Sequence, residues 1–273
     1  MPNEDKKQSA RVFNFLALPN DSTAKTFIMA TLVCLVCAVF VSVSAVALKP
    51  LQILNKELDK KKNILQVAGL YQDGDDIEAA FSKIEIKLID LATGEYSTEL
   101  DAASYDEIKA AKDPALNVKI PKNKDFGSIR MRPKLMPVYQ VKEGGVVTQL
   151  ILPVNGYGLW STLYGFLAVE NDGQTIVGLS YYQHAETPGL GGEVDNPKWK
   201  KIWVGKKIYG DNGDVAIKVV KGAVIPGVRG EEFQVDGLAG ATLTSRGVSN
   251  MLAYWMGAEG YQKYLNKIQA NGV

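Results

Sequence analysis

One unbroken apolar run dominates the N-terminal part of the chain. No charged residue occurs from Thr26 to Leu48, and at about 1.5 Å of rise per residue a helix over this stretch would be roughly 34 Å long. That length is sufficient to cross the hydrocarbon core of a bilayer. The pattern therefore predicts a transmembrane helix at residues 26–48, preceded by a short polar tail at residues 1–25.

The same run has a second interpretation as a cleaved signal peptide. Ala45-Val46-Ala47 has the small-x-small form of a cleavage site. Signal peptides, however, have an apolar core of about 7–15 residues, which this run exceeds. We therefore favour a retained single-pass anchor. A single span cannot form a pore by itself, so any ion route would belong to partner subunits.

Beyond the anchor, apolar residues continue at helical spacing. Leu51, Leu54, Leu58 and Leu65 form a roughly heptad-spaced stripe. This spacing predicts that the helix extends past the membrane and ends before the Asp73-Gly74 turn.

The rest of a membrane-proximal region, which we place at residues 49–136, has a weaker pattern. Ile84, Ile86 and Leu88 alternate with polar residues, which predicts a strand that ends at the turn Ala92-Thr93-Gly94. Residues 101–137 are rich in Lys and Pro and are expected to contain helix and loop.

The centre of the chain has the strongest strand patterns, and they open a domain that we place at residues 137–273. Short turns at Gly144-Gly145 and Asn171-Asp172-Gly173 separate neighbouring runs, and short connections make neighbouring strands antiparallel. The expected fold is α+β, with one mainly antiparallel sheet and helices packed on one side. The predicted strands are residues 138–141, 146–152, 163–169 and 175–183.

Helical patterns return in the last part of the chain. Asn196-Pro197 is a helix-start signal, and residues 215–219 alternate as a strand. Thr244 or Ser245 is expected to cap the next helix. Apolar positions at helical spacing predict three helices: Trp199, Ile202 and Trp203 in the first, Val248, Met251, Leu252 and Trp255 in the second, and Tyr261, Tyr264, Leu265 and Ile268 in the third.

Charge and cysteine content narrow the function. Lys and Arg total 31 against 30 for Asp and Glu, so nucleic acid is not an expected partner. Cationic residues lie on both sides of the apolar run, and the positive-inside rule does not decide its orientation. Cys34 and Cys37 both lie within that run. Their spacing allows a redox pair, but we interpret them as small packing residues. The remaining chain has no thiol for disulfides, zinc or iron–sulfur clusters.

The stretch Asp236 to Gly247, with the sequence DGLAGATLTSRG, has the features of an attachment site for an anionic cofactor. Residues 237–242 are small apart from Leu238, so another molecule could approach the backbone closely. Thr242 offers a hydroxyl close to the start of a predicted helix, where N–H groups and the helix dipole favour a phosphate. The alternative is a Gly-Ala turn with a threonine cap.

Two loops could complete a pocket for a flat ring. The loop at residues 156–161, GYGLWS, presents Leu159 and Trp160. The loop at residues 184–192, HAETPGLGG, combines Glu186, Thr187 and Leu190 around a Pro-Gly turn. We expect these polar groups to face the polar edge of the ring. Each loop alone is equally consistent with an ordinary turn.

Other catalytic chemistry has no sequence support. His184, the single histidine, is interpreted as a sheet-edge side chain. The chain has no nicotinamide fingerprint, no nucleophile–His–Asp set and no metal-ligand cluster. We therefore expect a protein that holds, orients and tunes a cofactor.

Three motifs together, GYGLW, HAETPGLG followed by WKKIWVGK, and DGLAGATLTS, resemble the C subunits of sodium-translocating NADH:quinone oxidoreductases. The resemblance covers nearly the whole chain. It implies that Thr242 carries FMN through a phosphoester bond, although Ala239 and Leu243 depart from the usual attachment pattern. By position it also implies ring, ribityl or phosphate contacts for Leu159, Trp160, Glu186, Thr187, Leu190, Lys207 and Thr244.

The resemblance further implies a setting. The chain would be a single-pass protein of a bacterial inner membrane, with residues 1–25 cytoplasmic and the FMN domain periplasmic. It would relay electrons from NADH toward ubiquinone, coupled to sodium export. Its partners would be an NADH-oxidising flavin and iron–sulfur subunit, membrane subunits, and a flavin transferase during maturation.

Two other functions are open at the level of sequence. The related G subunit of a ferredoxin:NAD ion-pumping complex would share the FMN domain and the anchor. A membrane-anchored binding domain without redox activity would use the Gly-rich loops only as turns. Co-purifying subunits distinguish the first alternative, and the effect of Thr242→Val on activity distinguishes the second.

Overall fold

The computed structural model describes residues 19 and 21–271. Most of the predicted tail at residues 1–25 therefore lies outside the described residues. The chain divides into two compact units, Met1–Lys56 and Glu57–Val273. The helix α1 (Thr23–Val67) runs from the first unit into the second, and among the described helices it alone is long and apolar enough to cross a membrane. The predicted extension of the anchor helix beyond residue 48 is confirmed.

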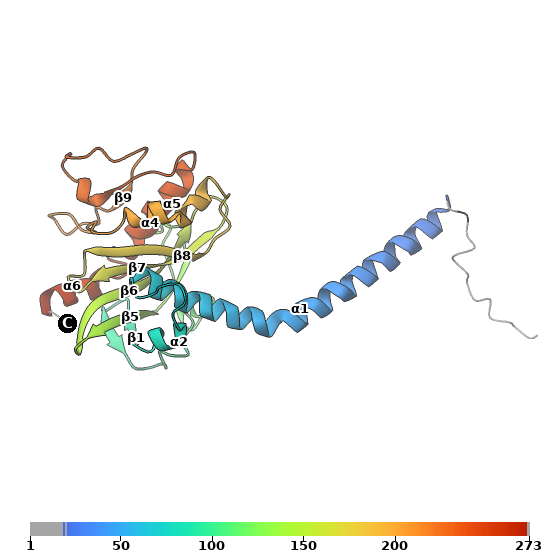
Figure 1. Cartoon of the computed structure of the whole chain (residues 1–273), viewed down its shortest axis with the longest axis horizontal. Coiled ribbons are helices and arrows are strands. Elements are labelled where there is room, and N and C mark those ends of the chain that lie inside the picture. Colours follow the sequence, from blue (N-terminus) through green and yellow to red (C-terminus); the bar gives the residue numbers. More distant parts are fainter. Residues whose placement is uncertain (1–18, 20, 272–273) are drawn as a thin grey trace, which may run out of the picture. The chain divides into compact units, whose positions relative to one another are not determined.

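The second unit contains short helices around one large sheet (Figure 1). Its helices are α2 (Ile77–Phe81), α3 (Glu107–Ala110), α4 (Pro197–Lys201), α5 (Thr242–Trp255) and α6 (Gln262–Asn271), with 3-10 helices η2 (Gly191–Asp195) and η3 (Glu231–Phe233). Its strands are β1 (Ile84–Asp90), β2 (Glu95–Ser97), β3 (Asn117–Lys119), β4 (Met131–Pro133), β5 (Leu135–Glu143), β6 (Val146–Tyr157), β7 (Thr162–Glu170), β8 (Ile176–Gln183), β9 (Lys218–Val219) and β10 (Gln234–Val235).

The main sheet has six strands in the order β2-β1-β5-β6-β7-β8, and every neighbouring pair is antiparallel. The expected antiparallel sheet is confirmed. β1 pairs with β5 along its whole length, from Ile84 opposite Val141 to Asp90 opposite Leu135. The domain boundary expected at residue 137 therefore falls inside β5, within one continuous sheet.

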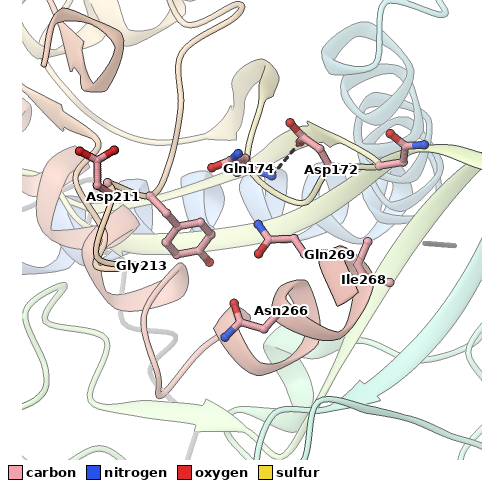
Figure 2. A pocket seen from close by; sticks show the side chains of 10 residues that line it. Asp172, Gln174, Asp211, Gly213, Asn266, Ile268 and Gln269 are labelled. Atoms are coloured by element: carbon pink, nitrogen blue, oxygen red, sulfur yellow. Dashed lines mark hydrogen bonds between the residues drawn. The ribbon is translucent and has the colours of Figure 1, made fainter. Parts of the chain in front are cut away.

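The turn between β7 and β8 and the turn between β6 and β7 lie at opposite ends of β7. Asp172 Oδ1 accepts hydrogen bonds from the backbone N–H groups of Gln174 at 2.9 Å and Thr175 at 2.7 Å. A polar cavity of about 530 Å³ lies beside this turn, and residues of α6 form another of its walls (Figure 2). The predicted Asn-Asp-Gly turn is thus confirmed, and the Asp172 side chain holds it.

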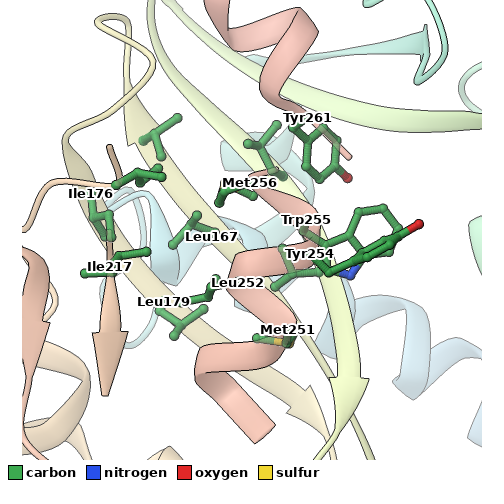
Figure 3. Close-up of a cluster of buried hydrophobic side chains, with 14 of the residues drawn as sticks. Leu167, Ile176, Leu179, Ile217, Met251, Leu252, Tyr254, Trp255, Met256 and Tyr261 are labelled. Atoms are coloured by element: carbon green, nitrogen blue, oxygen red, sulfur yellow. The ribbon is translucent and has the colours of Figure 1, made fainter. Parts of the chain in front are cut away.

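One face of the sheet is covered by α4, α5 and α6. Val248, Met251, Leu252 and Trp255, predicted as the apolar side of α5, are all fully buried, and α5 packs across β6. Figure 3 shows this helix against Leu167 and Leu179 of the sheet. The predicted helical stripe therefore forms the main core and fixes the rotation of α5.

The opposite face is also covered, and the expectation of helices on one side was wrong. Ile64 and Leu65 at the end of α1 are buried against Ile151, Phe166 and Ala168 of the sheet. The physical reason is visible in the central strands, whose consecutive residues are apolar: Leu150, Ile151 and Leu152 alternate between the two faces and all are buried. A strand that is apolar on both sides requires cover on both sides.

Candidate functional site

Three segments far apart in the sequence meet at the N-terminal end of α5. Their common contact is the Glu186 side chain, which is 5% exposed. Its Oε1 accepts hydrogen bonds from the backbone N–H groups of Leu159 at 3.0 Å, Trp160 at 2.9 Å and Ser161 at 3.4 Å. Its Oε2 accepts a hydrogen bond from the Thr244 hydroxyl at 2.7 Å. The structure therefore brings both candidate loops and the Thr242 stretch together.

Two glycines lie close to this carboxylate, where a side chain would collide with it. A Cβ on Gly158 would lie 2.6 Å from Glu186 Oε1. A Cβ on Gly191 would lie 2.6 Å from both Glu186 Oε2 and Thr244 Oγ1. Real side chains do not approach this closely. The glycines of the two motifs therefore allow the three segments to pack closely together.

The helix α5 begins three or four residues earlier than expected. Ala241 is its N-cap and makes no side-chain cap hydrogen bond, and Thr242 is the first helical residue. The expectation that Thr244 or Ser245 caps the helix was wrong. Both hydroxyls lie inside the first turn and bind other segments, since Thr244 donates to Glu186 and Ser245 Oγ accepts from the backbone N–H of Leu238 at 3.0 Å.

The Thr242 hydroxyl is available to a ligand. Thr242 is exposed, whereas Thr244 is 1% exposed. The backbone N–H groups of the first turn of a helix have no intrahelical partner, and no side chain caps them here. An exposed hydroxyl next to these groups and the positive end of the helix dipole is a suitable place for an esterified phosphate.

Exposed apolar side chains accompany this hydroxyl. Leu159 is 38% exposed, Trp160 65%, Leu190 45% and Leu243 51%. Leu159 and Trp160 lie in the loop that binds Glu186, and Leu190 lies in the loop that contains Glu186. Leu243 lies in the first turn of α5. A flat aromatic ring system held at Thr242 would cover apolar surface that is otherwise in contact with water. The residues present therefore fit a flavin phosphate.

The environment of Glu186 keeps its carboxylate ionised. Burial by itself would raise the pKa of Glu186, but the hydrogen bonds from the Thr244 hydroxyl and from the N–H groups of Trp160, Leu159 and Ser161 outweigh it and lower the pKa below the usual value of 4.5. Hydrogen bonds to the charged form stabilise that form. The expectation that Glu186 faces the cofactor ring does not fit this geometry, because protein donors use both of its oxygens.

The remaining residues of the second loop have mainly structural contacts. Thr187 is exposed, and its carbonyl accepts hydrogen bonds from Leu190 at 3.1 Å and Gly192 at 2.9 Å. His184 Nδ1 accepts from the Glu186 N–H at 3.2 Å, while Nε2 lies 2.6 Å from Asp195 Oδ2. The loop is thus folded on itself, and the Thr187 side chain is free to face a ligand.

Lys207 does not belong to this site. Its ammonium contacts Asp172 at 3.4 Å and donates to the Thr175 hydroxyl. Both partners lie between the end of β7 at Glu170 and the start of β8 at Ile176, and Figure 2 shows Asp172 there. Trp160 precedes the other end of β7 at Thr162. A nine-residue strand separates these ends by about 30 Å. The expected ring, ribityl or phosphate contact by Lys207 does not fit this placement, because the acidic turn pairs with this lysine.

Sequence reasoning missed two polar groups that organise the site. Ser161 Oγ accepts a hydrogen bond from the Ala185 N–H at 2.7 Å, which joins the two loops directly. Asp236 Oδ1 accepts from the Val224 N–H at 2.8 Å. Both are small polar residues inside the motifs, but their partners lie in other segments, and the sequence contains no signal for such pairings.

Comparison with known proteins covers the region of the chain that contains these segments. Residues 158–257 match the family model of the FMN-binding domain. The chain is thus an FMN-binding domain protein that carries a long apolar helix near its N-terminus.

Its relatives define the family more closely. It is 51% identical over 253 residues to the C subunit of the Na(+)-translocating NADH-quinone reductase from Pseudomonas aeruginosa, covering 91% of this chain and 97% of that protein. It is 45% identical to the same protein from Vibrio anguillarum, covering 94% of this chain and 100% of the relative. The chain belongs to the family of these C subunits.

Solved structures show the same fold. The crystal structure of Shewanella oneidensis NqrC superposes with a TM-score of 0.73 at 35% identity and covers 80% of this chain and 100% of that chain. The crystal structure of the corresponding protein from Parabacteroides distasonis gives a TM-score of 0.62 at 31% identity, with 80% and 96% coverage.

Proposed function

We propose that this chain is the electron-relay subunit of a Na⁺-translocating NADH-quinone reductase and that it carries FMN covalently on the Thr242 hydroxyl. The family membership and the FMN-binding domain support the flavin and the complex. The observation that supports the attachment point is the exposed Thr242 hydroxyl at a helix N-terminus that no side chain caps.

The chain itself supplies binding and orientation. The first turn of α5 would hold the phosphate, while Leu159, Trp160 and Leu190 would pack on the ring system and the Thr187 hydroxyl could face its polar edge. Bound FMN supplies reversible redox chemistry. The ester bond keeps the cofactor at a high effective concentration, which matters where released flavin would be lost by dilution.

Attachment requires an activated donor. In the step that we propose, the Thr242 oxygen forms a bond to the FMN phosphorus, and the phosphoanhydride bond of a flavin dinucleotide breaks. The hydroxyl proton passes to a base of the flavin transferase, and a nucleoside monophosphate leaves. No atom changes oxidation state. An exposed acceptor hydroxyl is necessary for this step, because a second enzyme must reach it.

The setting of the chain follows from its anchor and its family. The apolar helix supports a single-pass anchor in a bacterial membrane complex. We propose that the FMN domain lies on the periplasmic side and residues 1–25 on the cytoplasmic side, as the family resemblance implies. Electrons from NADH would arrive from a flavin and iron–sulfur subunit and pass through membrane subunits to ubiquinone, coupled to sodium export.

The variant Thr242→Val tests the attachment. It removes the hydroxyl with little change in volume, so the fold should persist while covalent flavin and NADH-to-quinone turnover are lost. Thr98→Val, an exposed threonine outside the site, is the matched control and should keep both. Full turnover by the Thr242→Val complex would overturn the proposed function.

A further inference from the structure

The Glu186 carboxylate joins three segments without facing solvent. It accepts four hydrogen bonds, three from backbone N–H groups of residues 159–161 and one from the Thr244 hydroxyl. Glu186 is 5% exposed and Thr244 is 1% exposed. A transferase therefore cannot contact either side chain directly, and any effect of these residues on the cofactor must pass through the groups that they hold.

The contact with Thr244 acts together with the buried stripe of α5 to hold the rotation of its first turn. Successive residues of an α-helix are separated by about 100°, so Thr242 and Thr244 point about 160° apart around the axis. With the Thr244 hydroxyl bound inward to Glu186, the Thr242 side chain is directed outward, where it is exposed. The same carboxylate therefore helps to hold the turn in the rotation that presents the Thr242 hydroxyl.

The contacts with the backbone fix the apolar side of the site. The N–H groups of Leu159 and Trp160 bind one oxygen of Glu186, and their side chains extend from the same loop into solvent. A side chain at Gly158 or Gly191 would collide with this carboxylate, so glycine at both positions is required for its placement. The carboxylate thus connects this loop to the start of α5, in addition to the close packing of Gly247 on Tyr157 and Gly158.

We propose that Glu186 is a positioning residue, which sets the Thr242 acceptor hydroxyl and the Trp160 loop in one geometry and thereby controls the rate of flavin attachment and the environment of the attached ring. It does this without contacting the flavin. The inference rests on the proposed function, since it concerns the same hydroxyl. The covalent step is the one given above, with a flavin dinucleotide as donor.

The test measures attachment to the full-length chain by its flavin transferase, with flavin dinucleotide supplied. The initial rate of covalent flavin formation is followed by in-gel fluorescence and intact mass, and the visible circular dichroism of the loaded protein reports the ring environment. The variants are Glu186→Gln, Thr244→Val, Thr244→Ser and the double variant Glu186→Gln/Thr244→Val. Glu232→Gln, an exposed glutamate, is the control.

Thr244→Val and Glu186→Gln should each slow attachment by on the order of tenfold, because small misplacement of a reacting group lowers rates by such factors. Thr244→Ser, which keeps the hydroxyl, should restore the wild-type rate. The double variant should be slower than the slower single variant by less than the product of the two single effects, since both changes disturb the Glu186–Thr244 hydrogen bond. The circular dichroism should change in the slow variants and not in the control.

Three results would count against the inference. Wild-type rates and spectra in both Glu186→Gln and Thr244→Val would show that Glu186 does not position the site. Additive slowing in the double variant, or failure of Thr244→Ser to restore the rate, would show that the two residues act separately. A wild-type chain that acquires no flavin would instead remove the proposed function, and this inference with it. If Glu186→Gln does not fold, the comparison of Thr244→Val with Thr244→Ser decides the outcome.

Discussion

Three hydroxyl side chains within the first turn of α5 have three different surroundings. Thr242 is exposed, Thr244 donates to Glu186, and Ser245 accepts from Leu238. The sequence alone predicted that this stretch is an attachment site and that a helix follows it. It could not show which of the hydroxyls are bound to other segments, because the partner of Thr244 lies 58 residues away in the chain. Likewise, Lys207 matched a family position, but the acidic β7–β8 turn pairs with it.

The ionisation of Glu186 predicts an acid-sensitive site. Its folded-state pKa lies below 4.5, so its contribution to stability is complete above the unfolded pKa and is lost as the pH falls through the folded pKa. The difference in unfolding free energy between wild type and Glu186→Gln should therefore be constant above about pH 5.5 and shrink below about pH 4.5. Chemical denaturation across this range measures it. A difference that grows on acidification would contradict the assigned direction of the pKa.

Full removal of the Glu186 carboxylate should destabilise the domain. Glu186→Ala leaves buried N–H groups of the 159–161 loop and the Thr244 hydroxyl without their acceptor, at a cost of about 3 kcal/mol. The exposed control Glu232→Gln should change the unfolding free energy by less than about 0.5 kcal/mol. Urea denaturation of both variants provides the comparison. Equal stabilities would mean that water replaces the carboxylate at no cost.

Among the elements, α5 connects the core to the site. Its buried side carries Leu252 and Trp255, and its first turn carries Thr242 and the half-exposed Leu243. The predicted periodicity of this helix was correct because burial on one face imposes a period of 3.6 residues. Its start lies three or four positions before the predicted one, because helix starts are set by local backbone geometry and tertiary contacts as well as by capping residues.

Two leucines of α5 should separate stability from cofactor environment. Leu252→Ala removes a fully buried side chain and should cost about 2–5 kcal/mol. Leu243→Ala changes a side chain that is 51% exposed, so it should leave the unfolding free energy nearly unchanged while altering flavin fluorescence. Denaturation and fluorescence of the flavin-loaded variants test both statements. The reverse assignment, with Leu243 decisive for folding, would contradict the orientation of the helix.

The end of α1 is part of the folded domain. Leu65 is fully buried against the sheet, so Leu65→Ala should also cost about 2–5 kcal/mol. Leu54, in the same helix but 52% exposed, is the matched control, and its change to Ala should leave domain unfolding unaffected. Thermal unfolding of the two variants in detergent makes the comparison. Equal melting temperatures would show that α1 does not stabilise the sheet.

At the scale of the whole molecule, the sequence predicted the helices and strands better than it predicted which helix packs on which face of the sheet. Turn signals and alternation located the central strands, and the apolar run located the anchor helix. The apolar stretch around Ile151 is buried on both faces of the sheet, but nothing in that stretch shows that the end of a helix some 85 residues earlier packs on it. Long-range pairing of this kind is decided by complementary surfaces, which one sequence does not reveal.

The proposed orientation gives a topological prediction. In a chain with Cys34→Ser and Cys37→Ser, a cysteine introduced by Thr98→Cys lies on the exposed surface of the FMN domain. It should react with a membrane-impermeant maleimide in intact spheroplasts. Ser9→Cys in the N-terminal tail should react only after lysis. Labelling of the tail variant alone in intact spheroplasts would place the domain on the cytoplasmic side.

The most direct test of the account is the mass of the peptide that contains Thr242, in protein purified from its native membrane. Trypsin should release residues 230–246, which include Thr242, Thr244 and Ser245. We predict that this peptide carries the mass of one FMN and that fragmentation locates it on Thr242. An unmodified peptide, or a flavin on Thr244 or Ser245, would contradict the assignment of the exposed hydroxyl as the attachment point.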